Sequence, residues 1–136
     1  MTLAETCAAQ MWAHDRASAA LGMALGPVGA GTAELRLTVT ECMLNGLGSC
    51  HGGIIFALAD SAFAFACNSH GEHAVAAQCQ VAFLRPARLG DELVATARER
   101  VREGRTGITD VTVRVGDQVV AEFRGHSRTT GGRFDV

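Results

Sequence analysis

The stretch NGLGSCHGGIIFALADSAFAFACNS, residues 45–69, decides the fold. Its residues 52–68 carry a single charged side chain, Asp60, in a run that is otherwise apolar or small. This pattern predicts a helix that is apolar nearly all round and is therefore buried. Burying a carboxylate is costly unless the group is paired or functional, which makes Asp60 the first candidate for a functional residue. A silent, hydrogen-bonded structural acid is the alternative.

The segments on either side predict the remaining elements. Residues 4–20 are rich in Ala and lack Gly and Pro, which favours a helix, and the glycines of 22–31 indicate a loop. Residues 32–39 alternate between apolar and polar side chains, as in a half-buried strand. The same reading predicts four later strands, at 74–86, 92–102, 107–115 and 118–128. Gly116-Asp117 indicates a tight hairpin turn, and residues 103–107 indicate a longer hairpin loop. Residues 129–136 are expected to form a frayed tail.

An antiparallel sheet with one apolar face needs something apolar to cover it, and the predicted helix after residue 52 is the natural cover. The expected class is therefore α+β, with the hotdog architecture of a sheet wrapped around a long central helix. We expect one domain, 1–136, in which 1–30 form an N-terminal helix and loop.

Composition excludes several classes of function. The chain has 136 residues, 12 basic and 14 acidic side chains and a formal net charge of −2, which does not suit a nucleic-acid partner. No apolar run reaches the ~18 residues of a membrane span, so no membrane partner is expected. The five cysteines are odd in number and form no CxxC motif. Free thiols in a reducing cytoplasm are the simplest interpretation.

Three motifs resemble a known family. They are N-G-x-G-x-x-H-G-G-x-x-F-x-L-A-D-x-A-F-A, then FLRPARLGD, then FRGHSRTTGG, and the match that they mark runs from about Met43 to Gly132. Together they are similar to the PaaI-type thioesterases of phenylacetate degradation, which have the hotdog fold. The resemblance implies a cytoplasmic acyl-CoA thioesterase that assembles as a dimer of dimers and uses no metal or cofactor, coenzyme A being part of the substrate. An aryl- or arylacetyl-CoA, such as phenylacetyl-CoA or a ring-hydroxylated relative, is the implied substrate.

The same resemblance assigns roles to four residues. Asp60 matches the catalytic carboxylate, the backbone N–H of Gly52 matches the donor to the thioester carbonyl, and Asn45 and His51 match residues that line the site. Each has a structural alternative. His51 can cap the helix, Asn45 can shape its loop, and the glycines can serve close packing.

The start of the predicted helix has the chemistry of such a site. Gly52 and Gly53 open the helix, so their N–H groups lack intrahelical partners and lie at the positive end of its dipole, as an oxyanion site requires. Eight residues of helix span ~12 Å, so Gly52 and Asp60 of one chain cannot share a carbonyl group. Two helices antiparallel across a two-fold axis would bring them together, which predicts a homodimer with composite sites. Attack by Asp60 and activation of water both stay open, and position 64 is Ala and offers no hydroxyl to hold a water.

The chain contains arginine but no lysine, and the arginine guanidinium can bind a phosphate group through two hydrogen bonds. We expect the substrate and its CoA portion to contact a set of residues near the motifs: Gly53, Phe83, Arg85, Pro86, Arg88, Arg105 and Thr106. A second basic group, Arg98, Arg100 and Arg102, has the i, i+2, i+4 spacing of one strand face. That face is either solvated or a further cradle for phosphate.

Two other patterns in the sequence resemble functional sites. Cys67, His70 and His73 have metal-like spacing but supply only three ligands, so no metal is expected. Cys50 beside His51 is a poor nucleophile–base pair, because sequence neighbours seldom face each other.

Two other functions are alternatives to a thioesterase. A hotdog hydratase or dehydratase would use a pair formed by His51 and Asp60. A non-catalytic acyl-CoA sensor would usually add a DNA-binding segment, for which the N-terminus shows no basic helix pair.

Overall fold

The computed structural model describes all residues, 1–136. Its helices are α1 (Leu3–His14), α2 (Arg16–Ala20), the 3₁₀ turn η1 (Glu41–Met43) and α3 (Gly52–Cys67). Its strands are β1 (Ala24–Gly29), β2 (Thr32–Thr38), β3 (Glu72–Phe83), β4 (Glu92–Glu103), β5 (Thr106–Val115) and β6 (Gln118–Arg133). The strands form one antiparallel sheet in the order β1-β2-β4-β5-β6-β3.

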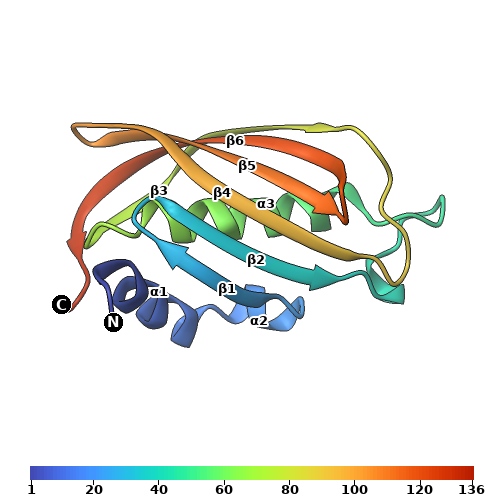
Figure 1. The fold of residues 1–136 in the computed structure, drawn as a ribbon, viewed down its shortest axis with the longest axis horizontal. Coiled ribbons are helices and arrows are strands. Elements are labelled where there is room, and N and C mark those ends of the chain that lie inside the picture. The colour runs from blue at the N-terminus through green and yellow to red at the C-terminus, as the bar shows by residue number, and fades with distance from the viewer.

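The sheet curls around α3, which confirms the α+β hotdog fold predicted from the sequence (Figure 1). The buried side of α3 packs on the inward residues of β2, β4 and β5, while α1 and α2 lie along the β1 side. The fit is close, because a Cβ added at Gly125 of β6 would lie 2.7 Å from the ring of Phe63. None of the helices combines the length and apolar character needed to cross a membrane.

The N-terminal region differs from the prediction in two places. The single helix expected over 4–20 is two helices, since Asp15 ends α1 and caps α2 by accepting a hydrogen bond from the Ser18 backbone N–H. The loop expected over 22–31 contains strand β1, so residues 1–30 are more than a helix and a loop. Pro27 fits there because β1 is an edge strand with a shifted register between Leu25 and Val28.

The C-terminal prediction was also wrong in part. The expected frayed tail, 129–136, continues β6 to Arg133, and the Phe134 backbone N–H donates to the Gly71 carbonyl. The loop expected over 103–107 is a two-residue turn of Gly104 and Arg105 between β4 and β5. Gly104 has a φ of 61°, which a glycine adopts easily and which lets the turn be that short.

A register shift in β4 separates the three arginines expected on one face. Between Glu99 and Val101 the pairing with β5 slips, so Arg100 is an extra residue and the alternation of faces reverses after it. Arg100 then approaches Asp110, at 4.0 Å, and Arg102 pairs with Glu72 of β3, at 3.1 Å. The prediction of one shared face for Arg98, Arg100 and Arg102 is therefore wrong.

Candidate active site

The loop before α3 is built around Asn45. Its side-chain Oδ1 accepts hydrogen bonds from the backbone N–H groups of Leu47, at 2.9 Å, and Ser49, at 3.1 Å. The Asn45 backbone N–H also donates to the Ser49 carbonyl, at 2.7 Å. These bonds close a compact Asx-type loop that delivers the chain to the start of α3. Asn45 therefore shapes this loop, and it also lines the pocket beside Gly52.

His51 caps α3 through its side chain. Its Nδ1 accepts a hydrogen bond from the Gly53 N–H, at 2.9 Å, and the residue itself is exposed. The Gly53 N–H is therefore already used. The Gly52 N–H makes no hydrogen bond within the chain, so one unpaired donor remains at the positive end of the helix dipole. Of the two candidate oxyanion donors, the N–H groups of Gly52 and Gly53, only that of Gly52 is free.

A surface pocket of about 310 Å³ opens directly at this donor. The ring of Phe83 stands over Gly52, since a Cβ added at Gly52 would lie 3.2 Å from its tip. The pocket is mainly apolar, with the Arg85 side chain at its rim, and its lining residues are Asn45, Cys50, Gly52, Ile55, Phe83, Leu84, Arg85 and Pro86. Its apolar lining suits an apolar group held next to a backbone N–H.

Asp60 lies two turns further along α3, on a helix face that is only partly buried. It is half-buried and has no hydrogen-bond or ion-pair partner, so burial alone raises the pKa of its carboxyl above the usual value. Gly53, Ala57 and Ala64 share this face and are small. An unpartnered carboxylate among small side chains is accessible to a substrate, unlike the hydrogen-bonded structural acid of the alternative interpretation.

Asp60 and the Gly52 pocket are separate within one chain. The pocket contains no acidic residue, and α3 is continuous from Gly52 to Cys67. At 1.5 Å per residue the two positions are ~12 Å apart along the helix axis. A single thioester carbonyl bound at Gly52 is therefore out of reach of Asp60 from the same chain.

The thiols near the site are poorly suited to nucleophilic attack. Burial raises the pKa of Cys50 in the pocket, and burial together with the charge of Asp60 raises the pKa of Cys79. Burial, with the Glu99 and Asp60 charges, raises the pKa of Cys67 to about 12. Because the thiolate is the reactive form, these groups are inert at neutral pH. The sequence analysis did not predict that Cys79 lies near Asp60. Cys79 alternates with Val81 and Phe83 on the side of β3 that faces α3, and this alternation could have indicated it.

The basic residues expected at CoA fall at two ends of the sheet. Arg85 lines the Gly52 pocket, where its Nη1 donates to the Val119 carbonyl at 3.0 Å, and Pro86 and Arg88 follow it in the chain. Arg105 lies in the β4–β5 turn and donates to the Thr129 carbonyl, and Thr106 is the first residue of β5. Val113 lies at the end of β5 that is near the pocket, and Thr106 is seven residues away from it along the strand. At about 3.3 Å per residue, Arg85 and Arg105 are therefore roughly 20–25 Å apart.

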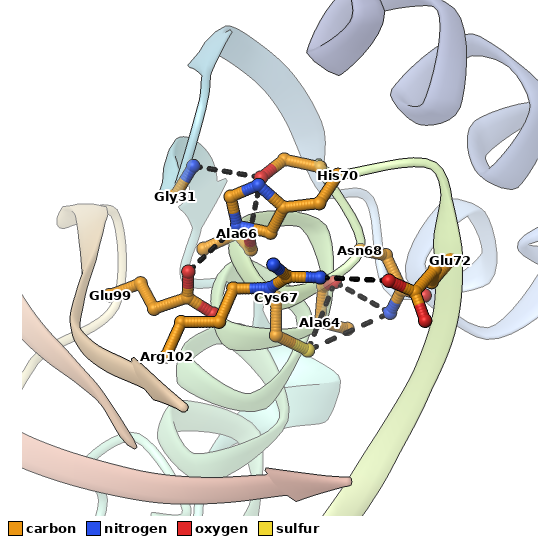
Figure 2. Close-up of polar contacts among 10 residues, drawn as sticks. Gly31, Ala64, Ala66, Cys67, Asn68, His70, Glu72, Glu99 and Arg102 are labelled. Atoms are coloured by element: carbon orange, nitrogen blue, oxygen red, sulfur yellow. Dashed lines mark hydrogen bonds and ion pairs between the residues drawn. The ribbon is translucent and has the colours of Figure 1, made fainter. Parts of the chain in front are cut away.

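The C-terminal end of α3 is occupied by structural polar contacts (Figure 2). His70 Nε2 lies 2.7 Å from Glu99, and Arg102 pairs with Glu72. His73 stacks edge-on against Phe134, with ring centroids 4.4 Å apart. The two histidines of the metal-like spacing are therefore each engaged with a different partner.

The comparisons with known proteins agree with this geometry. Residues 47–122 match the model of the thioesterase superfamily. The chain belongs to the thioesterase superfamily. It is 47% identical over 123 residues to the acyl-coenzyme A thioesterase PaaI of Escherichia coli K12, covering 90% of this chain and 88% of that one. This thioesterase is therefore a thioester hydrolase, and acyl-CoA thioesters are its substrate class.

Solved structures support the same placement. The E. coli PaaI structure superposes on this thioesterase with a TM-score of 0.95 and 44% identity, covering 98% of this chain and 97% of that one. A Streptococcus mutans UA159 protein, solved bound to acetyl CoA, superposes with a TM-score of 0.79 and 30% identity, covering 82% of this chain and 91% of that one.

Proposed function

We propose that this thioesterase hydrolyses aryl- or arylacetyl-CoA thioesters, such as phenylacetyl-CoA or a ring-hydroxylated relative, to the free acid and CoA. The observation that carries the proposal is that α3 presents both an unbonded Gly52 N–H and, two turns away, an unpartnered and half-buried Asp60. Similarity to E. coli PaaI, an acyl-coenzyme A thioesterase, and to a protein solved with acetyl CoA supports the CoA ester. The five free cysteines fit a cytoplasmic location.

In this proposal the Gly52 N–H donates to the thioester carbonyl oxygen, where negative charge grows during attack. The Asp60 carboxylate acts from the opposite side in one of two ways. As a nucleophile it bonds to the carbonyl carbon and expels the CoA thiolate, leaving a mixed anhydride for water to hydrolyse. As a base it takes a proton from the water that attacks, and the thiolate leaves from the tetrahedral intermediate.

A homodimer is proposed as the catalytic unit, so that Gly52 of one protomer meets Asp60 of its partner. Strand β3 supports this arrangement. It is a 12-residue edge strand with no Pro or Lys, and Val75 and Phe83 are about half exposed on it. Such an edge is a ready template for pairing with a second copy, which would set the two α3 helices side by side and antiparallel. Two such dimers are proposed to form a tetramer, as the resemblance to PaaI-type enzymes implies.

The aryl preference is supported by Phe83. Its ring is about half exposed and stands over Gly52, where it offers a face or an edge to a substrate ring. Aromatic pairs of this kind add about 0.5–1.5 kcal/mol beyond the area that they bury.

The proposal is tested by measuring thiol release from a panel of phenylacetyl-, hydroxyphenylacetyl-, benzoyl-, acetyl- and long-chain acyl-CoA. We expect the highest kcat/KM with the aryl and arylacetyl esters. A higher kcat/KM with the straight-chain esters would contradict the aryl preference. Turnover of crotonyl-CoA without CoA release, in a chain inactive on the panel, would indicate a hydratase instead.

Arg85, which lines the pocket, and Arg88, three residues further along the chain, should hold the CoA phosphates. We expect Arg85→Ala and Arg88→Ala each to raise KM for the CoA ester a few-fold with little change in kcat, because the contact is equally good in the ground and transition states. Each exposed contact is worth ~1 kcal/mol or less. Arg105→Ala should behave in the same way, with Arg105 reaching the nucleotide from the partner protomer.

Two controls make this test specific. Arg114 is exposed on β5 and has no ion-pair partner, so Arg114→Ala should leave KM unchanged. An N-acetylcysteamine thioester keeps the reacting group but lacks the nucleotide, so all variants should match the wild type with it. Unchanged KM for the CoA ester in all three variants would show that these arginines are solvated surface residues.

A further inference from the structure

A chain of hydrogen bonds connects the N-terminal helices to α3 beside Asp60. Ser18 of α2 is only 2% exposed, and its Oγ donates to Asp15 Oδ2 at 2.7 Å. The same Oγ lies 2.9 Å from the Oγ of Ser61 on α3. Asp15 also accepts from the Ser18 backbone N–H through its second oxygen. The carboxylate, the buried hydroxyl and the helix residue after Asp60 thus form one connected set.

The direction of each bond in this set is determined. A carboxylate at neutral pH only accepts, so the Ser18 hydroxyl hydrogen must point to Asp15. Ser18 Oγ must then accept, and the Ser61 hydroxyl hydrogen is the one that fills the 2.9 Å contact. A serine inside a helix ordinarily bonds back to its own helix or to water. Here Ser61 is instead tied to another element.

We infer that Ser18 and Ser61 are positioning residues for Asp60, so that the N-terminal helices are part of the catalytic apparatus. This inference rests on the proposed function. Ser18 and Asp15 lie outside the residues 47–122 that match the superfamily model, so the shared thioesterase core does not supply this contact.

The physical reason is the sensitivity of Asp60 to rotation of α3. Asp60 has no hydrogen bond of its own, and its helix face carries only the small residues Gly53, Ala57 and Ala64, so packing on the opposite side of α3 and contacts at neighbouring residues must hold it in place. A side chain about 5–6 Å from a helix axis moves about 1 Å for a rotation of about 10°. A displacement of that size can cost up to 10²-fold in rate. The contact at Ser61 opposes it at the adjacent residue.

The test compares Ser18→Ala with a matched control, Ser69→Ala. Ser69 follows the C-terminal end of α3 and is 3% exposed, and its Oγ also makes two hydrogen bonds, from the Gly31 N–H and to the Ala66 carbonyl. We expect both variants to lower Tm. Only Ser18→Ala should lower kcat, about tenfold, with KM within about twofold of wild type.

A second pair guards against a Ser18 variant that fails to fold. Ser61 is half-buried, and Ser61→Ala should lower kcat while Ser61→Thr, which retains the hydroxyl, should restore it. The inference is overturned if Ser18→Ala or Ser61→Ala keeps the wild-type kcat at 25 °C while only Tm falls. With Asp60→Asn inactive in the same assay, that result rejects the positioning role alone. An active Asp60→Asn would reject the proposed function and this inference with it.

Discussion

Replacing Asp60 by Asn is expected to lower kcat by on the order of 10²-fold or more, the usual scale for removing a general base. The amide keeps the shape of the side chain but can neither attack the thioester nor accept a proton from water. The Gly52 pocket itself is lined by no acidic residue, so no second carboxylate there can substitute for Asp60. The measurement is steady-state thiol release at saturating acyl-CoA. Activity within a few-fold of wild type would reject the assignment of Asp60.

Stability separates this loss from misfolding. Because burial raises the pKa of Asp60, the folded protein holds that proton more tightly than the unfolded chain does. Wild-type stability therefore falls as the pH rises from the usual Asp pKa through the raised one. The Asn variant escapes this penalty, so we expect its Tm at pH 7 to equal or exceed that of wild type. The difference should disappear below about pH 4.

Asp110 provides the matched control. It accepts hydrogen bonds from Arg124 at 2.6 and 2.9 Å on the outer face of the sheet, and this contact lowers the pKa of its carboxyl. Its contribution to stability is present at neutral pH and lost as the pH falls through the lowered pKa. Asp110→Asn should therefore leave kcat unchanged and give a Tm at pH 7 equal to or below that of wild type, opposite in direction to the change at Asp60.

The sheet and the central helix were predictable because their patterns are long and regular. The alternation of 32–39 and the apolar run after Gly52 correspond directly to β2 and α3. Strand β1 was missed because Gly26, Pro27 and Gly29 are typical of loops, and only an edge position with a shifted register accommodates them. Extension of β6 depends on pairing with β3, a contact between segments distant in sequence.

The candidate site likewise has features that could be predicted from the sequence and features that could not. Asp60 stood out because it is charged within an apolar helix, and Gly52 because glycines opened that helix. The capping bond from Gly53 to His51 depends on a side-chain rotamer, and the bulge at Arg100 depends on the register of two strands, so neither has a periodic signature. The contact between Ser18 and Ser61 joins residues 43 positions apart, and no local pattern marks either serine.

Mixed dimers should regain activity that neither parent chain has. Asp60→Asn removes the carboxylate, and Gly52→Val places a branched side chain against the Phe83 ring and obstructs the pocket. Each homodimer should be inactive. In a mixed dimer with composite sites, one site carries both defects and the other carries neither. Equal co-expression should therefore restore about a quarter of wild-type activity, since half of the dimers are mixed and half of their sites are intact.

The reverse experiment uses a chain that carries both substitutions, co-expressed equally with wild type. If each site is composite, every mixed dimer has two defective sites, because each site takes one group from the altered chain. Only wild-type homodimers then work, and activity should fall to about a quarter. If Gly52 and Asp60 of one chain formed a site, the first mixture would stay inactive and the second would retain about half. Either result would show that the catalytic unit is a single protomer and that the antiparallel arrangement of two α3 helices is wrong.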